Sequence, residues 1–203
     1  MNRNVGVLML IVLAGLGGTA IFLVQQTAAP HIAAERRAIE NRNLLQMLPP
    51  GSYDNQPLDQ PLSTHKVQLG ASTLLGGYLA TRSAEPSAVI LRSQTVGYAG
   101  PVELLIGIGA NGKLLGVKAL KHTETPGLGG NIAVTPNPWL QGFVGKSRDE
   151  PGDSGWALKK DNGQFDQMAG ATITSRSVIS AIHDALRYFD EHQAQLTGKP
   201  AHD

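Results

Sequence analysis

The chain of 203 residues contains no cysteine. Disulfide bonds, thiolate-ligated zinc and iron–sulfur clusters held only by cysteine are therefore excluded. Aromatic residues make up only 5% of the sequence, which argues against a stacking platform for single-stranded nucleic acid. An excess of charge of one sign is also lacking, because 17 Lys and Arg residues are balanced by 16 Asp and Glu residues. This balance gives no long-range field for binding nucleic acid, so we expect no nucleic-acid partner.

Charge is absent altogether from residues 5–24, which read VGVLMLIVLAGLGGTAIFLV. About 20 apolar residues suffice for a helix that crosses a bilayer core of roughly 30 Å. A cleaved signal peptide is the alternative, since Thr27-Ala28-Ala29 is small enough for cleavage, but the run exceeds the usual apolar core of a signal. We predict a single transmembrane helix at residues 5–24, preceded by a cytoplasmic tail at residues 1–4.

Residues 25–50 are predicted to form a helical stalk or linker, which Pro49-Pro50-Gly51 ends. Residues 51–203 remain for one exported domain that finishes in a helix. Within that domain, residues 176–192 carry apolar side chains at helical spacing and should pack on a sheet.

The predicted sheet is built from alternating apolar residues. Residues 73–81, 88–96 and 156–159 are candidate strands, and Asn111-Gly112 is a strong hairpin signal. Apolar residues alternate on both sides of that hairpin, so each set should share one face of the sheet. The sets are Val102, Leu104, Ile106 and Ile108 before the turn, and Leu115, Val117 and Ala119 after it. Antiparallel strands with packed helices predict an α+β fold.

Residues 166–175, DQMAGATITS, look unlike ordinary core or loop. Gly170 and Ala171 remove bulk beside Thr172, so another molecule can approach the backbone closely. Thr174 or Ser175 is a natural N-cap for the helix that follows. A phosphate attached near Thr172 could lie at the positive end of that helix. A capped helix start after a turn would explain the same residues without any ligand, so both interpretations stay open from these residues alone.

The same segment resembles the flavinylation motif of the FMN-binding domain family, in which an Asp precedes a small-Gly-Ala-Thr tetrad. Asp166 and Gly170-Ala171-Thr172 match it in spacing, whereas Ala169 stands where Ser or Thr is commoner. In that family a flavin transferase takes FMN from FAD and joins its phosphate to the Thr hydroxyl as a phosphoester. The resemblance implies that Thr172 carries covalent FMN as the substrate of a modification and that the chain has no catalytic residue of its own.

The resemblance covers nearly the whole chain. Gly97-Tyr98-Ala99-Gly100, Asn111-Gly112, residues 122–129 and residues 165–177 occur in the order seen in the G subunit of the Rnf (Rsx) electron transport complex, and the N-terminal span is shared. It implies one component of an ion-translocating oxidoreductase (a translocase) that couples electron transfer between NADH and ferredoxin to ion movement. The implied location is the bacterial inner membrane, with the domain on the periplasmic side. The implied partners are other Rnf membrane subunits, which bear a flavin and an iron–sulfur centre, and a flavin transferase for maturation.

Residues 122–129, HTETPGLG, lie near the flavin in that family. The resemblance implies that His122, Glu124 and Thr125 hydrogen-bond the isoalloxazine or ribityl groups, and that glycines let the backbone approach the ring. A rigid turn set by Pro126 and Gly127 would explain the segment without a ligand. The complete set of expected cofactor-binding residues is Thr172, Gly170, Ala171, Thr174, His122, Glu124, Thr125, Gly127 and Leu128.

Three alternatives remain open. The C subunit of a sodium-translocating NADH:quinone reductase shares both motifs, although the short chain and Phe165-Asp166-Gln167 favour Rnf. The other two are a non-redox, membrane-anchored periplasmic adaptor and a hydrolase with Thr172 or Thr174 as nucleophile, for which no Gly-x-Ser-x-Gly elbow is present. We expect no metal site, because the histidines show no ligand spacing. They are His31, His65, His183, His192 and His202, besides His122.

Overall fold

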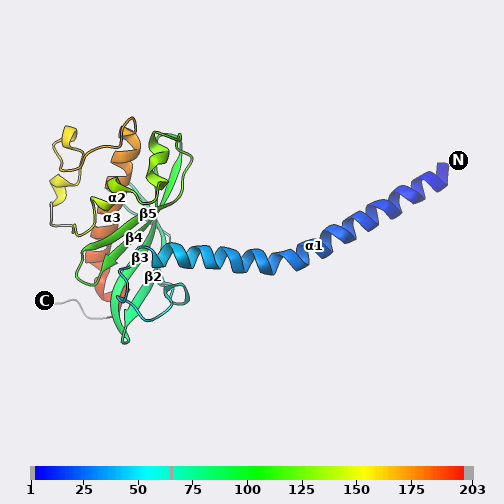
Figure 1. Cartoon of the computed structure of the whole chain (residues 1–203), viewed down its shortest axis with the longest axis horizontal. Helices are drawn as coiled ribbons and strands as arrows, with labels where there is room; N and C mark the ends of the chain where they lie inside the picture. The colour runs from blue at the N-terminus through cyan, green and yellow to red at the C-terminus, as the bar shows by residue number, and fades with distance from the viewer. Residues whose placement is uncertain (1–2, 65, 199–203) are drawn as a thin grey trace. The chain divides into compact units, whose positions relative to one another are not determined.

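The structure is a computed structural model that describes residues 3–64 and 66–198 (Figure 1). It forms two compact units, the first ending at Arg42 and the second beginning at Asn43. The first unit consists of helix α1 (Arg3–Leu45), which continues into the start of the second. The predicted span and most of the predicted stalk are thus one continuous helix, with Pro30 inside it. Because proline has no N–H group, one hydrogen bond of the helix is missing at Pro30.

Among the described residues, the stretch Val5–Leu45 of α1 is the one helix that is long and apolar enough to cross a membrane. Its apolar side chains are exposed on all sides, for example Leu10 at 69% and Ile21 at 70%. A helix that is apolar all round requires an apolar environment, although a signal sequence near an N-terminus meets the same criteria.

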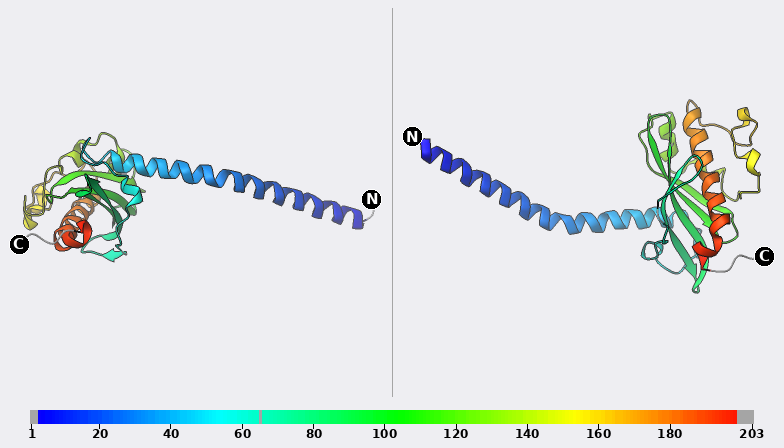
Figure 2. Two further views of the ribbon diagram at one scale, coloured as in Figure 1. Left: turned by 90° about the horizontal axis from the view of Figure 1, so that it is seen from below. Right: turned by 180° about the vertical axis from the view of Figure 1, so that it is seen from behind.

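The second unit is built on a five-stranded antiparallel sheet, with the strands in chain order from one edge to the other (Figure 1). Helix α3 (Thr172–Thr197) crosses one face and packs chiefly on the third and fourth strands (Figure 2). The α+β prediction is confirmed. The strands are β1 (Val67–Gln68), β2 (Thr73–Arg82), β3 (Glu85–Val96), β4 (Pro101–Gly109) and β5 (Leu114–Lys121). The short helices are η1 (Pro57–Asp59), η2 (Gly129–Ala133), α2 (Pro138–Gln141), η3 (Asp153–Gly155) and η4 (Lys159–Asp161).

Both faces of the sheet are covered, so β4 is buried along almost its whole length. The four alternating apolar residues of β4 lie in the cluster beneath α3, as predicted. Leu105 points the other way, into a smaller cluster with Leu44, Met47 and Ile90. The hydrophobic core therefore lies mainly between the sheet and α3.

The pattern on β5 is interrupted by a β-bulge. Gly107 of β4 pairs with Gly116, but the next residue, Ile108, pairs with Leu114. Leu115 is the extra residue and packs on the smaller cluster, while Leu114 enters the main core. The prediction that Leu115 shares a face with Val117 and Ala119 is wrong, because one inserted residue shifts the side-chain alternation of a strand by one.

Two of the hairpin turns differ in how well the local sequence predicts them. Gly112 adopts a φ of +75° in the predicted turn between β4 and β5, and Asn111 Oδ1 accepts a hydrogen bond from the Lys113 N–H over 3.2 Å. The β2–β3 turn instead uses Ser83 and Ala84 at positive φ. Residues 156–159 form no strand, since only an isolated bridge joins Leu158 to Phe165; that prediction is wrong.

Candidate functional site

Thr172 is the first residue of α3, and its side chain is half-buried. Its hydroxyl donates a hydrogen bond to Gln167 Oε1 over 2.9 Å. The same oxygen accepts a hydrogen bond from Lys160 Nζ, also over 2.9 Å. The structure therefore holds the Thr172 hydroxyl between an amide and an ammonium group. The sequence predicts neither partner: Gln167 lies inside the motif without an expected role, and no spacing connects Lys160 to Thr172.

The start of α3 differs from the prediction. The helix begins at Thr172, four residues earlier than expected, and its N-cap residue is Ala171. Ser175 lies inside the first turn, where its hydroxyl donates to the Ala171 carbonyl over 2.8 Å and accepts from the Met168 N–H over 2.9 Å. Thr174 and Ser175 are therefore not N-caps, because the turn that Ser175 closes already lets the helix begin at Thr172.

Gly170 brings the two sequence motifs into contact. It adopts a φ of +69°, and a Cβ atom built on it would lie 2.6 Å from Leu128 Cδ2. No larger residue fits there without displacing Leu128 or straining the backbone. Ala171 beside it is buried. Residues 122–129 and 166–175 thus lie side by side, as the predicted common site requires.

Glu124 is the most buried side chain of the first motif, at 6% exposure. Its Oε2 atom accepts a hydrogen bond of 2.6 Å from the hydroxyl of Thr174, which is itself fully buried. Its Oε1 atom accepts a hydrogen bond of 2.9 Å from the Ala99 N–H. Both oxygens therefore have partners within the fold. The expected contacts of Glu124 and Thr174 with a flavin stay predictions, and the structure gives both residues a role in joining segments.

The remaining residues of the first motif form a turn at the surface. The Thr125 carbonyl accepts from the Leu128 N–H over 3.1 Å and from the Gly130 N–H over 2.9 Å. Gly127 adopts a φ of +79°, with nothing within 4 Å of a Cβ built there. His122 is half-buried, and its buried Nδ1 atom has no hydrogen-bond partner in the described part of the chain. Thr125, Gly127 and Leu128 are exposed and accessible to a ligand.

Three exposed apolar side chains belong to the segments that meet near the start of α3. Ile173 follows Thr172 in the chain and is 48% exposed, and Leu128, against Gly170, is 45% exposed. Tyr98 is 74% exposed, and its N–H lies 3.4 Å from Thr174 Oγ1. A planar, largely apolar ring held at Thr172 would find apolar partners on this surface.

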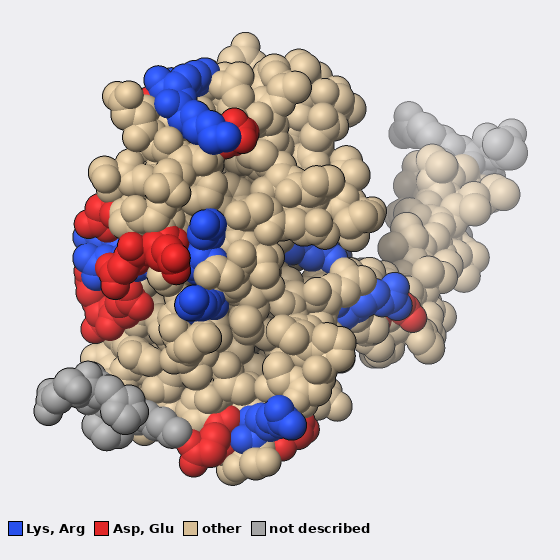
Figure 3. Space-filling view, turned by 60° about the vertical axis from the view of Figure 1, so that its left-hand side comes forward, with Lys and Arg blue, Asp and Glu red and all other residues tan. Residues whose placement is uncertain are grey.

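Ion pairs connect the segments around Thr172. Arg176 of α3 donates to both carboxylate oxygens of Asp161, over 2.6 and 2.8 Å. This hydrogen bonding lowers the pKa of Asp161 below its ordinary value, and the charge of Arg176 adds to the effect. Lys159 pairs with Asp166 over 2.7 Å. On the face shown in Figure 3, Lys and Arg gather in small groups beside Asp and Glu. Both hydrogen-bond partners of the Thr172 hydroxyl, Lys160 and Gln167, line a pocket of about 260 Å³, whose other lining residues are Leu158, Lys159, Phe165 and Asp166.

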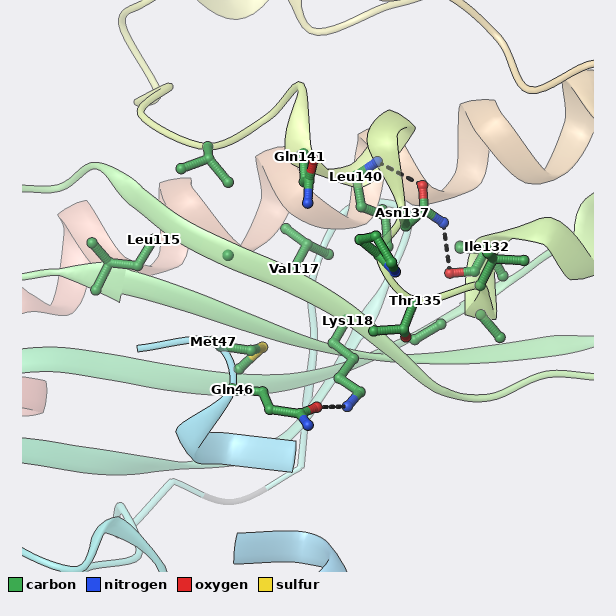
Figure 4. A pocket seen from close by; sticks show the side chains of 16 residues that line it. Gln46, Met47, Leu115, Val117, Lys118, Ile132, Thr135, Asn137, Leu140 and Gln141 are labelled. Atoms are coloured by element: carbon green, nitrogen blue, oxygen red, sulfur yellow. Dashed lines mark hydrogen bonds between the residues drawn. The ribbon is translucent and has the colours of Figure 1, made fainter. Parts of the chain in front are cut away.

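A second pocket, of about 320 Å³, lies between β5, the turn after α1 and the segment that leads into α2 (Figure 4). Asn137 shapes its wall by accepting from the Leu140 N–H over 3.0 Å and donating to the Ile132 carbonyl over 2.9 Å. Burial lowers the pKa of Lys118, which reaches Gln46 at the opposite side. None of its lining residues belongs to either motif. This pocket is therefore not part of the candidate site, which is formed by residues 122–129 and 166–175.

The histidines that the structure describes lie apart from one another. Among the described residues, no group of three or more His, Cys, Asp and Glu side chains could hold a metal ion. His183 lies 2.9 Å from Asp153, and His192 lies 3.0 Å from the Tyr188 carbonyl. His65 and His202 lie outside the described residues.

Comparison with known proteins shows the family of the chain. The FMN-binding domain family matches residues 97–187. The G subunit of the ion-translocating oxidoreductase complex of Pseudomonas aeruginosa is 48% identical over 198 residues, which cover 97% of this chain and 92% of that protein. The protein of the same name from Vibrio cholerae is 39% identical and covers 79% of each chain. Among solved structures, the C subunit of the Na⁺-translocating NADH-quinone reductase from Parabacteroides distasonis is similar (TM-score 0.47, 23% identity), covering 63% of this chain and 65% of that one.

The sheet, helix α3 and the matched residues 97–187 define an FMN-binding domain. The chain belongs to the family of G subunits of ion-translocating oxidoreductase complexes, to which the match at 48% identity extends over almost its full length. The predictions of an Rnf-type G subunit, of an FMN-binding electron-transport protein and of one component of an oxidoreductase complex are confirmed. The quinone-reductase and adaptor alternatives are not favoured, because the relatives that match most of the chain are named as G subunits of the ion-translocating complex.

Proposed function

We propose that this chain carries FMN esterified through its phosphate to Thr172 and relays electrons between other subunits of a membrane-bound Rnf complex. The observation that carries the proposal is the placement of the Thr172 hydroxyl. It is held at the first residue of α3, within the matched FMN-binding domain, beside a lysine and an exposed apolar surface. When bound, FMN supplies one-electron transfer.

The residues around Thr172 suit both the phosphate and the ring of FMN. The first N–H groups of α3 have no acceptor within the helix and could donate to a phosphate, which the helix dipole also favours. Lys160 adds a cation at the same place. The exposed Leu128 and Ile173 offer apolar contact to the ring, and Gly127 leaves room for its approach. The residues present therefore fit a covalently held FMN.

The finer assignments belong to the same proposal. We infer a cytoplasmic tail at residues 1–4, a span at residues 5–24, a stalk at residues 25–50 and a domain at residues 51–203 on the periplasmic side of the bacterial inner membrane. The complex would couple electron transfer between NADH and ferredoxin to ion movement. Its flavin- and iron–sulfur-bearing membrane subunits would be the redox partners, and a flavin transferase would load Thr172.

Intact-mass spectrometry tests the attachment. The full-length chain is coexpressed with a flavin transferase, and wild type should gain the mass of one FMN less one water. Thr172→Ala should lose this gain, whereas Thr172→Ser, which keeps a hydroxyl, should retain it. Peptide mapping should place the added mass on Thr172 and not on Thr174. A wild-type chain that keeps its unmodified mass, while a known acceptor in the same cells is modified, would overturn the proposal.

Labelling of single cysteines tests the membrane topology. Because the chain has no cysteine, single cysteines at Asn4 and at the exposed Gln141 report each side of the membrane without background labelling. In intact spheroplasts, a membrane-impermeant maleimide should label Gln141→Cys and spare Asn4→Cys until the membrane is broken. The reverse pattern would place the domain in the cytoplasm.

A further inference from the structure

Lys160 stands outside both sequence motifs, yet its Nζ atom lies 2.9 Å from the Thr172 hydroxyl oxygen. It is an exposed residue of the short helix η4. The ion pair between Asp161 of η4 and Arg176 of α3 joins the element that carries Lys160 to the element that begins with Thr172. This ion pair therefore supports the position of η4 beside the start of α3, from which the exposed Lys160 side chain reaches the hydroxyl.

The hydrogen bonds of the Thr172 hydroxyl leave it ready to form a bond. A hydroxyl has one hydrogen to donate and two lone pairs to accept with. The hydrogen goes to Gln167, and one lone pair accepts from Lys160. The second lone pair has no partner among the described residues, so it is free to meet an electrophile. The adjoining cavity of about 260 Å³, which Lys160 and Gln167 both line, leaves space for a group of phosphate size.

We propose that Lys160 is the phosphate-binding residue of this modification site. Its ammonium group binds the phosphoryl group as Thr172 is esterified, and afterwards pairs with the phosphodiester anion. This inference rests on the proposed function. Esterification forms the bond between Thr172 Oγ1 and the phosphorus of the flavin, and breaks the phosphoanhydride bond of FAD. Adenosine monophosphate leaves, and the hydroxyl proton is released.

Charge gives the physical reason for this assignment. The phosphodiester carries a negative charge, and a lysine is a common partner for phosphate oxygens. Lys159, the neighbouring lysine, is already paired with Asp166 over 2.7 Å. Lys160 donates to the Thr172 hydroxyl instead, so its charge is directed at the site of esterification.

The test measures how fast Thr172 is modified. The purified, unmodified full-length chain in detergent is incubated with a flavin transferase and FAD, and the mass increase is followed over time. Lys160→Met should slow the initial rate about 10- to 100-fold, as expected for loss of one hydrogen bond to a charged group. Lys160→Arg keeps the charge and should restore most of the rate. Lys113→Met is the matched control, since it removes an exposed lysine that faces Glu150.

Salt separates an electrostatic role from a structural one. The ratio of the wild-type rate to the Lys160→Met rate should shrink as salt rises from about 0.05 M to about 0.5 M, because ions screen exposed charges. The melting temperature of the unmodified Lys160→Met chain should equal that of wild type. Equal rates for wild type and Lys160→Met, or equal slowing by Lys113→Met, would overturn the role of Lys160 and leave the proposed function intact. A wild-type chain that is never modified would overturn both.

Discussion

The hydroxyl of Thr174 donates a hydrogen bond of 2.6 Å to Oε2 of Glu124, 50 residues earlier in the chain. The other oxygen of Glu124 accepts from the Ala99 N–H over 2.9 Å. One buried carboxylate therefore joins the loop at residues 97–100, the turn at residues 122–129 and the start of α3. This placement makes Glu124 a residue that positions the site.

Removal of the Glu124 carboxylate should destabilise the domain. Glu124→Ala leaves the buried Thr174 hydroxyl without its acceptor and removes the part-buried hydrogen bond to the Ala99 N–H, which should cost about 1–3 kcal/mol. Glu124→Gln keeps a carbonyl oxygen for Ala99 and can donate to Thr174, so it should cost about 1 kcal/mol. Urea unfolding of the full-length chain in detergent, followed by tryptophan fluorescence, measures both. Glu150→Gln, at a side chain that is 70% exposed, is the control and should change little. Wild-type stability of Glu124→Ala would contradict the positioning role.

Gly170 and Gly127 permit a matched comparison. Both have positive φ, but only Gly170 lacks space for a Cβ atom. Gly127→Ala should cost about 1–2 kcal/mol from backbone strain. Gly170→Ala should cost up to about 1 kcal/mol more, because its Cβ meets the end of the Leu128 side chain, which is 45% exposed and must change its rotamer to make room. Leu128→Ala should recover part of that excess in the double variant but none of the strain, which a double-mutant cycle would detect. Equal costs at the two glycines would show that the contact with Leu128 is unimportant.

Ser175 should stabilise the turn that presents Thr172. The side chain is fully buried, so Ser175→Ala leaves the Met168 N–H without its acceptor and should cost about 1–3 kcal/mol. Ser177→Ala, two residues along the same helix, should be neutral or slightly stabilising because alanine favours helix. Thermal unfolding of the two variants checks the difference. If both shift the melting temperature alike, the hydrogen bond to Met168 does not hold the turn.

The ion pair between Asp161 and Arg176 should appear in the pH dependence of stability. The pKa of Asp161 is lowered in the folded protein by the hydrogen bond from Arg176. A lowered pKa means that the stabilisation is fully present above the ordinary value of 3.8 and is lost as pH falls through the folded-state value. Asp161→Asn should therefore be less stable than wild type at pH 7, with the difference vanishing in acid. Melting temperatures between about pH 7 and pH 2 test this, and a constant difference across that range would contradict it.

The same variant also bears on Lys160, because Asp161 is its neighbour in η4. If the ion pair holds Lys160 beside Thr172, Asp161→Asn should slow flavin attachment less than Lys160→Met does, since the lysine itself remains. Asp59→Asn, far from Thr172 in sequence and located in η1, serves as the charge control. Attachment slowed equally by both aspartate variants would count against a local effect.

Local sequence patterns and the family resemblance predict many of the helices and strands of this protein and its two motifs. The apolar run at residues 5–24, the strands around Asn111-Gly112 and the amphipathic helix after Arg176 are signals carried by neighbouring residues, so they could be predicted from the sequence. Thr172 and the two motifs are recognisable for the same reason. The bulge at Leu115 and the glycine-free turn at Ser83 and Ala84 could not be predicted in this way, because pairing with adjacent strands decides them.

Only the tertiary structure decided which side chains meet at the site. Lys160 and Thr172 are 12 residues apart, across a loop without a repeating pattern, and they meet where the ion pair between Asp161 and Arg176 joins η4 to α3. The burial of Glu124 likewise depends on the packing of three separate segments. A sequence shows that a carboxylate or a lysine is present. Whether it is buried in a network or directed at a hydroxyl follows from long-range packing, because that packing sets which polar groups lose water and must find partners within the protein.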